Sequence, residues 1–148
     1  MPALVSMVEV ARPPEVAFSY VTDPSRFGEW QKNVVSGNME EDGPPSVGSK
    51  CITTRRIGFA ERPVTSEVTD ISPPRSWAVR GIDGPIRAIV NVTVEPLEEG
   101  TRSRITIALD FDAHGIGKLL VPLIVRREAR KEMPMNMRKL KDQLEIRD

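Results

Sequence analysis

Alternating apolar and polar positions dominate the chain before residue 113. In residues 102–112 every second position is one of Ser103, Ile105, Ile107, Leu109 and Phe111, and most of the positions between them are polar. Residues 86–95 show the same period, with Ala88, Val90, Val92 and Val94 on one side. A period of two with one apolar side predicts antiparallel strands that cover a core with one face.

Two short helices are expected between a first strand at residues 4–10 and the rest of the sheet. Pro14 is well placed to open a helix that continues through residues 15–21. Asp23 can cap a second helix, which begins with Pro24 and runs through Phe27 towards Trp30.

Six further strands are expected after these helices. Turn residues such as Asp83-Gly84-Pro85 and Glu99-Gly100 separate them, and the connections are too short for crossover helices. Strands adjacent in sequence are therefore expected to pair antiparallel. Their expected ranges are 34–41, 50–57, 60–71, 76–81, 86–95 and 102–112.

A helical period replaces the alternation from Gly115 to Leu144. Pro122 is tolerated in a first helical turn, whereas Pro134 lies deeper and is expected to kink the helix. Arg126 is the one charge in the apolar stripe; because two prolines interrupt the helical period, a solvent-facing side chain is favoured, and an inward one stays open. The other members of the stripe are Pro122, Ala129, Met133, Met137, Leu140 and Leu144.

A half-apolar helix that follows a half-apolar sheet has to lie across it, because each needs a partner for its apolar side. We therefore expect an α+β fold in which a curved antiparallel sheet of about seven strands wraps around the C-terminal helix. Such a sheet forms a container, which favours a small apolar molecule as ligand. The chain of 148 residues is expected to form one domain, residues 1–148.

Charge and cysteine content narrow the classes of function. Lys plus Arg and Asp plus Glu both total 21, so no overall basic character favours nucleic acid. Residues 113–148 nevertheless hold nine basic and five acidic side chains, against twelve and sixteen in residues 1–112. The single Cys51 excludes an intrachain disulfide, no secretory signal is visible, and the apolar run Leu119–Val125 is too short to span a membrane. We expect a cytoplasmic protein without integral membrane association.

Several short motifs follow one another over nearly the whole chain. They are Val8-Glu-Val, Pro14-Glu-Val-Ala-Phe-Ser-Tyr-Val-Thr-Asp-Pro, Phe27-Gly-Glu-Trp30, Glu67-Val-Thr-Asp-Ile-Ser-Pro-Pro-Arg75, Val94-Glu-Pro-Leu97 with Gly100-Thr-Arg, and Leu119-Leu-Val-Pro-Leu. In this order and spacing they resemble the START/Bet v 1-like (SRPBCC) superfamily, and most closely its polyketide cyclase/dehydrase-like subgroup. The resemblance implies the helix-grip fold. It implies no single activity, because such proteins include ring cyclases and binders of lipids and hormones.

Inward positions of the expected sheet and helix supply the candidate ligand-binding residues. Trp30 and Trp77 fit either core packing or an aromatic wall for a flat ligand. Arg55 and Arg126 could pair with an acidic or phenolic ligand group if they point inward. Met133 suits a core or a pliable pocket. The candidate set is Trp30, Arg55, Trp77, Val79, Val90, Val92, Ile107, Leu109, Leu123, Arg126 and Met133.

The sequence gives little support for a metal site or for a catalytic nucleophile paired with a histidine. His114 is the only histidine and Cys51 the only cysteine, and neither has a ligand-spaced neighbour. A Cys51–His114 pair oriented by Asp110 or Asp112 is a disfavoured alternative, because both carboxylates are expected on the solvated outer face. We expect no metal and no cofactor, and the sequence identifies no catalytic residue.

Three kinds of function stay open. The favoured one is a carrier or sensor that binds a lipid- or polyketide-like molecule between sheet and helix. The second is a polyketide cyclase or dehydratase that uses the same space, with Arg126, Arg55 and Glu67 as its polar groups. The third is a module that docks on a partner or a membrane surface through the basic helix. The apolar run Leu119–Val125 could serve such docking or form a homodimer contact.

Overall fold

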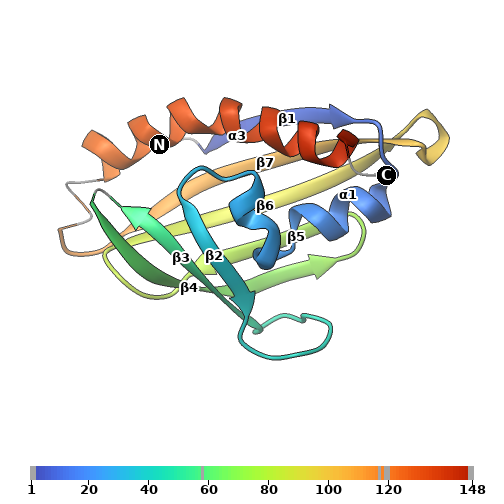
Figure 1. The fold of residues 1–148 in the computed structure, drawn as a ribbon. Helices are drawn as coiled ribbons and strands as arrows, with labels where there is room; N and C mark the ends of the chain where they lie inside the picture. Colours follow the sequence, from blue (N-terminus) through green and yellow to red (C-terminus); the bar gives the residue numbers. More distant parts are fainter. Residues whose placement is uncertain (1–2, 58, 117, 119–120, 147–148) are drawn as a thin grey trace.

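The computed structural model describes residues 3–57, 59–116, 118 and 121–146. Seven antiparallel strands form one curved sheet in the order β1-β7-β6-β5-β4-β3-β2 (Figure 1). The strands are β1 (Leu4–Val10), β2 (Val34–Met39), β3 (Lys50–Ile57), β4 (Ala60–Ser72), β5 (Ser76–Gly81), β6 (Ile86–Leu97) and β7 (Arg102–Ala113). The expected strands and their antiparallel pairing are confirmed, with ends that differ by up to two residues. A short 3-10 turn, η2 (Glu98–Gly100), joins β6 to β7.

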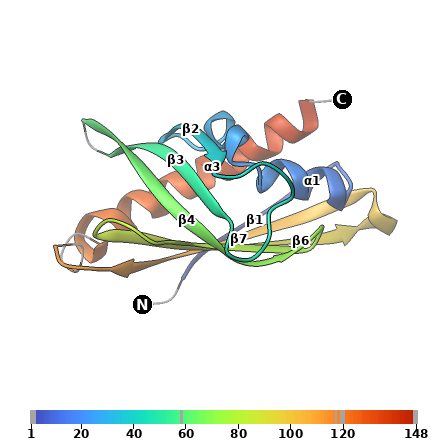
Figure 2. The same cartoon turned by 90° about the horizontal axis from the view of Figure 1, so that it is seen from below.

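Two short helices between β1 and β2 lie on the same face of the sheet as the C-terminal helix (Figure 2). They are α1 (Pro14–Val21) and the 3-10 helix η1 (Pro24–Glu29), whose cap Asp23 accepts a hydrogen bond from the Ser25 N–H. The helix η1 packs directly on β2. A Cβ atom at Gly37 would lie 2.5 Å from the carbonyl oxygen of Pro24, so this approach requires glycine.

The long helix α3 (Arg126–Ile146) crosses the concave face of the sheet, as the hydrophobic pattern predicts (Figures 1 and 2). A wider π-helical turn, η3 (Val121–Val125), precedes it; Pro122 within this turn has no N–H to donate. The helix α3 continues through Pro134, and the expected kink there stays a prediction. Arg126, Met137, Leu140 and Leu144 are buried and Ala129 and Met133 are half-buried, whereas Pro122 is exposed and does not belong to the stripe.

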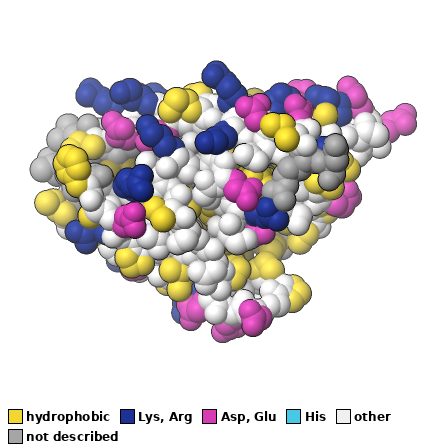
Figure 3. All heavy atoms as spheres, viewed as in Figure 1, with side chains coloured by type: hydrophobic (Ala, Val, Ile, Leu, Met, Phe, Trp, Pro, Cys, Tyr) yellow, Lys and Arg dark blue, Asp and Glu magenta, His cyan; other side chains and the backbone are white. Residues whose placement is uncertain are grey.

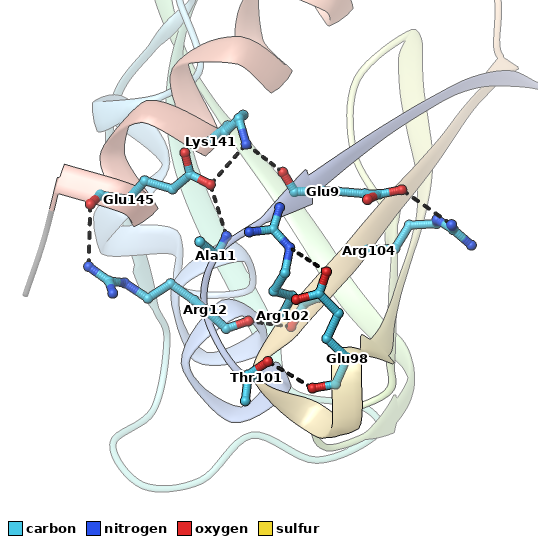
Figure 4. Close-up of polar contacts among 10 residues, drawn as sticks. Glu9, Ala11, Arg12, Glu98, Thr101, Arg102, Arg104, Lys141 and Glu145 are labelled. Atoms are coloured by element: carbon cyan, nitrogen blue, oxygen red, sulfur yellow. Dashed lines mark hydrogen bonds and ion pairs between the residues drawn. The ribbon is translucent and has the colours of Figure 1, made fainter.

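Polar contacts tie the C-terminal end of α3 to the junction between β1 and α1 (Figure 4). Glu145 Oε2 accepts hydrogen bonds from the Ala11 N–H at 2.9 Å and from Lys141 Nζ at 2.8 Å. Arg12 Nε donates to the carbonyl oxygen of Leu144 at 2.8 Å, one of the carbonyls that a helix end leaves without an intrahelical partner. These contacts hold α3 across the sheet at this end.

Burial along the inner faces of β6 and β7 changes from one end of the sheet to the other. Val92, Val94, Ile105 and Ile107 are at most 8% exposed. Towards the start of α3, the same faces carry the cross-strand pairs Val90–Leu109 and Ala88–Phe111, which are only half-buried. The packed core therefore fills the half of the interior near α1, and the inner face is less completely covered in the other half.

Candidate functional site

Arg55 follows two buried residues on the inner side of β3. Cys51 and Thr53 are each 3% exposed, and Arg55 comes next in the period of two. Arg55 Nε donates to Thr53 Oγ1 at 3.2 Å and Nη1 donates to Gln31 Oε1 at 3.3 Å. Burial lowers the pKa of Arg55, while the charges of Cys51 and Glu132 act in the opposite direction. The guanidinium keeps its charge at neutral pH, so β3 holds a poorly hydrated cation against neutral acceptors.

The segment between η1 and β2 connects this arginine to α3. Asn33 Nδ2 donates to both carboxylate oxygens of Glu132, at 2.9 and 2.7 Å. The Lys32 N–H donates to Asn136 Oδ1 at 3.3 Å. Because Gln31 accepts from Arg55, three consecutive residues join β3 to α3 and bring the carboxylate of Glu132 within electrostatic range of the guanidinium.

Sequence reasoning missed Gln31, Asn33, Thr53 and Glu132 as members of this cluster. The alternation on β3 contains a signal for Thr53, because it lies between Cys51 and Arg55 at the inward period. The others come from a loop and a helix flank, and only the three-dimensional fold brings them together.

Arg126 opens α3 and is buried, with 5% of its surface exposed. The favoured solvent-facing orientation is therefore wrong. Arg126 Nη1 lies 3.3 Å from Oδ1 of Asp110 on β7. Asp110 follows Leu109, which pairs with Leu4 at the first residue of β1, so its carboxylate lies at the margin of the β1–β7 ladder. This position explains why Asp110 reaches the helix, although it was expected to be solvated on the outer face.

Trp30 and Trp77 are enclosed by protein, with 5% and 4% of their surfaces exposed. Phe27 lies between them, with ring centroids 5.9 Å from Trp30 and 6.2 Å from Trp77 in edge-on geometry. This packing fits the core interpretation better than an open aromatic wall. The buried indole N–H of Trp30 has no hydrogen-bond acceptor among the described residues, which costs free energy.

The remaining candidate residues divide along the sheet. Val79, Val92 and Ile107 are part of the buried core, whereas Val90, Leu109 and Met133 are half-buried near the start of α3. The side chain of Leu123 lies outside the described part of the structure. The apolar run Leu119–Val125 is likewise described only in part, and its Ile124 is exposed.

Glu67 does not join the interior cluster. It is the cross-strand partner of the exposed Arg80, whereas its neighbour Val68 faces inward and is 1% exposed. Glu67, one of the polar groups considered for a cyclase or dehydratase, therefore does not lie with Arg55 on the inner side of the sheet.

The structure does not bring Cys51 and His114 together. Cys51 is buried, which raises the pKa of its thiol to about 11 against the opposing effect of Arg55. His114 is exposed, and its Nε2 lies 3.3 Å from Asp112, which also accepts from Arg80 at 2.9 Å. Within the described residues, no group of three His, Cys, Asp or Glu side chains could hold a metal ion.

Two surface hollows near α1 are separate from the candidate set. One, of about 230 Å³, is lined by Pro14, Glu15, Pro74, Arg75, Val94, Pro96 and Gly100. The other, of about 430 Å³, is lined by Glu15, Val16, Ser19, Tyr20, Asp23 and Arg26. No candidate ligand-binding residue lines either hollow, so neither defines the site.

A seven-stranded antiparallel sheet that grips one long helix defines the helix-grip class of the START/Bet v 1 superfamily. The chain belongs to the family described as polyketide cyclase/dehydrase and lipid transport, whose model matches residues 1–145. No curated protein matches the chain. No helix in the described part is long and apolar enough to cross a membrane.

Solved structures are similar over almost the whole chain. The Zhui aromatase/cyclase from Streptomyces sp. R1128 has a TM-score of 0.77 at 13% identity, covering 96% of this chain and 92% of its own. A START superfamily protein from Mycobacterium smegmatis has a TM-score of 0.74 at 16% identity, covering 97% and 99%. A conserved protein from Geobacillus kaustophilus has a TM-score of 0.68 at 20% identity, covering 95% and 93%. At these identities the likeness shows the fold alone.

Proposed function

We propose that the protein binds a hydrophobic small molecule between the inner faces of β6 and β7 and the first half of α3. The observation that carries this proposal is the uneven burial of one continuous apolar face. Val90, Leu109 and Met133 are half-buried near the start of α3, whereas Val92 and Ile107 are buried further along. A ligand that covers the exposed remainder gains about 25 cal/mol for each Å² of apolar surface removed from water.

The polar groups of the interior favour an apolar ligand that carries a hydrogen-bond acceptor. Arg55 is poorly hydrated, and among the described residues its hydrogen bonds go to the neutral oxygens of Thr53 and Gln31. A carboxylate, phenolate or sulfonate would form a charge-assisted bond with such a cation. Lipid-like and polyketide-like acids combine this group with the apolar surface, and a carrier or sensor needs no further chemistry.

A cyclase or dehydratase activity at the same place is the second candidate. The carboxylate of Glu132, held by Asn33 and within electrostatic range of Arg55, is the observation that favours it. In this alternative, Arg55 orients a carbonyl oxygen and Glu132 moves a proton on the neighbouring carbon. The Streptomyces aromatase/cyclase has the same fold, which is compatible with both candidates.

Competition binding tests the proposal. The probe is 1-anilinonaphthalene-8-sulfonate, an apolar dye with an anionic group, and the competitors are long-chain fatty acids, aromatic polyketide acids and their methyl esters. We expect the dye to bind saturably. We expect the acids to displace it at concentrations about tenfold lower than the esters require. Absence of saturable binding by the dye and by every competitor would overturn the proposal. The cyclase alternative would be supported if the protein closes a ring in a linear poly-β-carbonyl substrate and Glu132→Gln loses this activity while it still binds the substrate.

A further inference from the structure

Exposed apolar side chains gather at the end of the molecule where α3 begins. Phe59, in the turn between β3 and β4, is fully exposed; Ile116, after β7, is 65% exposed and Ile124, in η3, is 53% exposed. Figures 1 and 2 show these segments at the same end of the molecule. The side chains stand on separate turns, and each would lose contact with water by entering an apolar layer.

Basic side chains follow these tips closely in the sequence. Lys118, Arg62, Arg127 and Lys131 are exposed, and none of them forms an ion pair within the described part of the chain. Figure 3 shows dark-blue side chains along α3, with magenta ones among them towards one end, and further magenta side chains at the bottom, where the loop between β2 and β3 carries Glu40, Glu41 and Asp42. The formal net charge of the chain is zero, so attraction to an anionic surface depends on where its cations lie.

We propose that this end, which we call the docking surface (Phe59, Arg62, Ile116, Ile124, Arg127 and Lys131), binds the surface of an anionic lipid bilayer. Its cations match the negative charge of the lipid headgroups. Its apolar side chains can enter the boundary between headgroups and acyl chains, while the arginines and lysine stay at headgroup level.

The shape of the docking surface favours a bilayer over an acidic protein. A protein interface packs a contiguous apolar patch against a complementary surface. Here the apolar side chains belong to three separate segments, and a fluid bilayer accommodates each of them independently. The less covered half of the interior lies at the same end of the sheet, so docking would bring the ligand site close to the membrane.

Vesicle co-sedimentation tests the docking surface. Vesicles of phosphatidylcholine alone are compared with vesicles that contain about 30% phosphatidylglycerol, a lipid with the negative charge that basic segments recognise. We expect binding to the anionic vesicles to be about tenfold tighter, and to weaken about tenfold as salt rises from about 50 mM to about 500 mM. Equal binding to both vesicles, or no binding to either, overturns the proposal.

Two variants and a matched control locate the surface. The charge reversal Arg127→Glu/Lys131→Glu should abolish the preference for anionic vesicles, and Phe59→Ser should weaken binding while its salt dependence persists. The control, Lys50→Glu/Arg75→Glu, makes the same change in charge at exposed positions away from this end and should bind as the parent protein does. Equal losses in the control and in the charge reversal overturn the proposal. The proposal is also overturned if the protein does not bind vesicles but binds an acidic protein through the same basic residues in a salt-sensitive way.

The docking proposal is independent of the ligand proposal. Arg55→Met is expected to leave vesicle binding unchanged, because Arg55 lies on the inner side of β3. Dye binding in the absence of vesicles then reports on the interior alone, and vesicle binding in the absence of dye reports on the docking surface alone. Circular dichroism of each variant shows that a loss of binding is not a loss of fold.

Discussion

Nη1 of Arg55 lies 3.3 Å from Oε1 of Gln31, so a cation on the inner side of β3 is held by the segment that leaves η1. Two residues further along, Asn33 holds the carboxylate of Glu132 on α3. The sheet, the η1–β2 link and the long helix therefore meet at one polar cluster inside a largely apolar interior. In the function proposed above, this cluster supplies the preference of the ligand site for an acidic group.

Replacing Arg55 by methionine should separate recognition of charge from recognition of apolar surface. We expect Arg55→Met to weaken binding of acidic ligands about tenfold, or about 1.4 kcal/mol, because the charge-assisted bond is lost. The affinity of Arg55→Lys for acidic ligands should lie between those of the parent protein and Arg55→Met, since lysine keeps the charge without the planar guanidinium. Isothermal titration with a fatty acid and its methyl ester measures both effects. The control is Arg138→Met on α3, at an exposed position. An equal loss for acid and ester would contradict the role of Arg55.

The Asp110–Arg126 contact should contribute to stability, because one of its partners is buried. The side chain of Arg126 is 7% exposed and that of Asp110 is 42% exposed. We expect Asp110→Ala to lower the free energy of unfolding by about 1–2 kcal/mol, less than for a wholly buried pair. Asp112→Ala, which removes the exposed contact with Arg80, should cost less than about 1 kcal/mol.

Urea denaturation of Asp110→Ala, of Arg126→Met and of the double variant Asp110→Ala/Arg126→Met measures the coupling between Asp110 and Arg126. If the two substitutions add without coupling, the contact has no energetic role.

The fold was predictable because its signals are local and repeated. The alternation in β6 and β7 and the spacing of Met137, Leu140 and Leu144 on α3 indicate which side of each element is buried. The spacing along α3 places Arg126 on the side that the structure buries, but a solvent-facing side chain was favoured because a buried charge needs a partner and the sequence did not indicate Asp110. Extrapolating the helical period through the π-helical turn η3 placed Pro122 wrongly on the buried stripe.

The polar cluster was only partly predictable. Arg55 was identified as a candidate from its place on a long strand, but its partners Gln31, Asn33 and Glu132 lie in a loop and on a helix flank. No period links such residues, because their proximity depends on how η1 packs on β2 through Gly37. Glu67 was a candidate from its place on a long strand, but its neighbour Val68 takes the inward position on β4.

The contacts of Glu145 should make the anchor of α3 sensitive to acid. The hydrogen bond from Lys141, assisted by the Ala11 N–H, holds the pKa of Glu145 below its ordinary value of 4.5 although partial burial opposes this. Because the folded-state pKa is the lower one, the stabilisation is complete above the unfolded pKa and is lost as pH falls through the folded value. We expect Glu145→Gln to be less stable near neutral pH and to lose less stability on acidification. Urea unfolding from neutral to acidic pH measures this, with Glu41→Gln, in an exposed loop, as the control. If the free energy of unfolding depends on pH in the same way in the parent protein and in Glu145→Gln, Glu145 does not cause the acid sensitivity.

Leu140 should carry a large share of the packing between α3 and the sheet. It is fully buried in the core, so Leu140→Ala is expected to cost about 2–5 kcal/mol through lost burial and the cavity left behind. Met135, on the outer face of the same helix, is 49% exposed, and Met135→Ala should change stability by less than about 0.5 kcal/mol. Thermal and urea unfolding of the pair give the comparison. Similar small losses in both would mean that α3 does not cover the core as described.

The central claim is that a hydrophobic ligand occupies the less covered half of the interior. Met133 and Met137 are one turn apart on the inner side of α3; Met133 is half-buried and Met137 is 4% exposed. The most direct test is a methionine-methyl NMR titration with 1-anilinonaphthalene-8-sulfonate. We predict a saturable shift of the Met133 methyl resonance, with a much smaller shift of that of Met137. Shifts confined to the exposed Met7 and Met135, or an unchanged Met133 resonance at saturating dye, would contradict the claim.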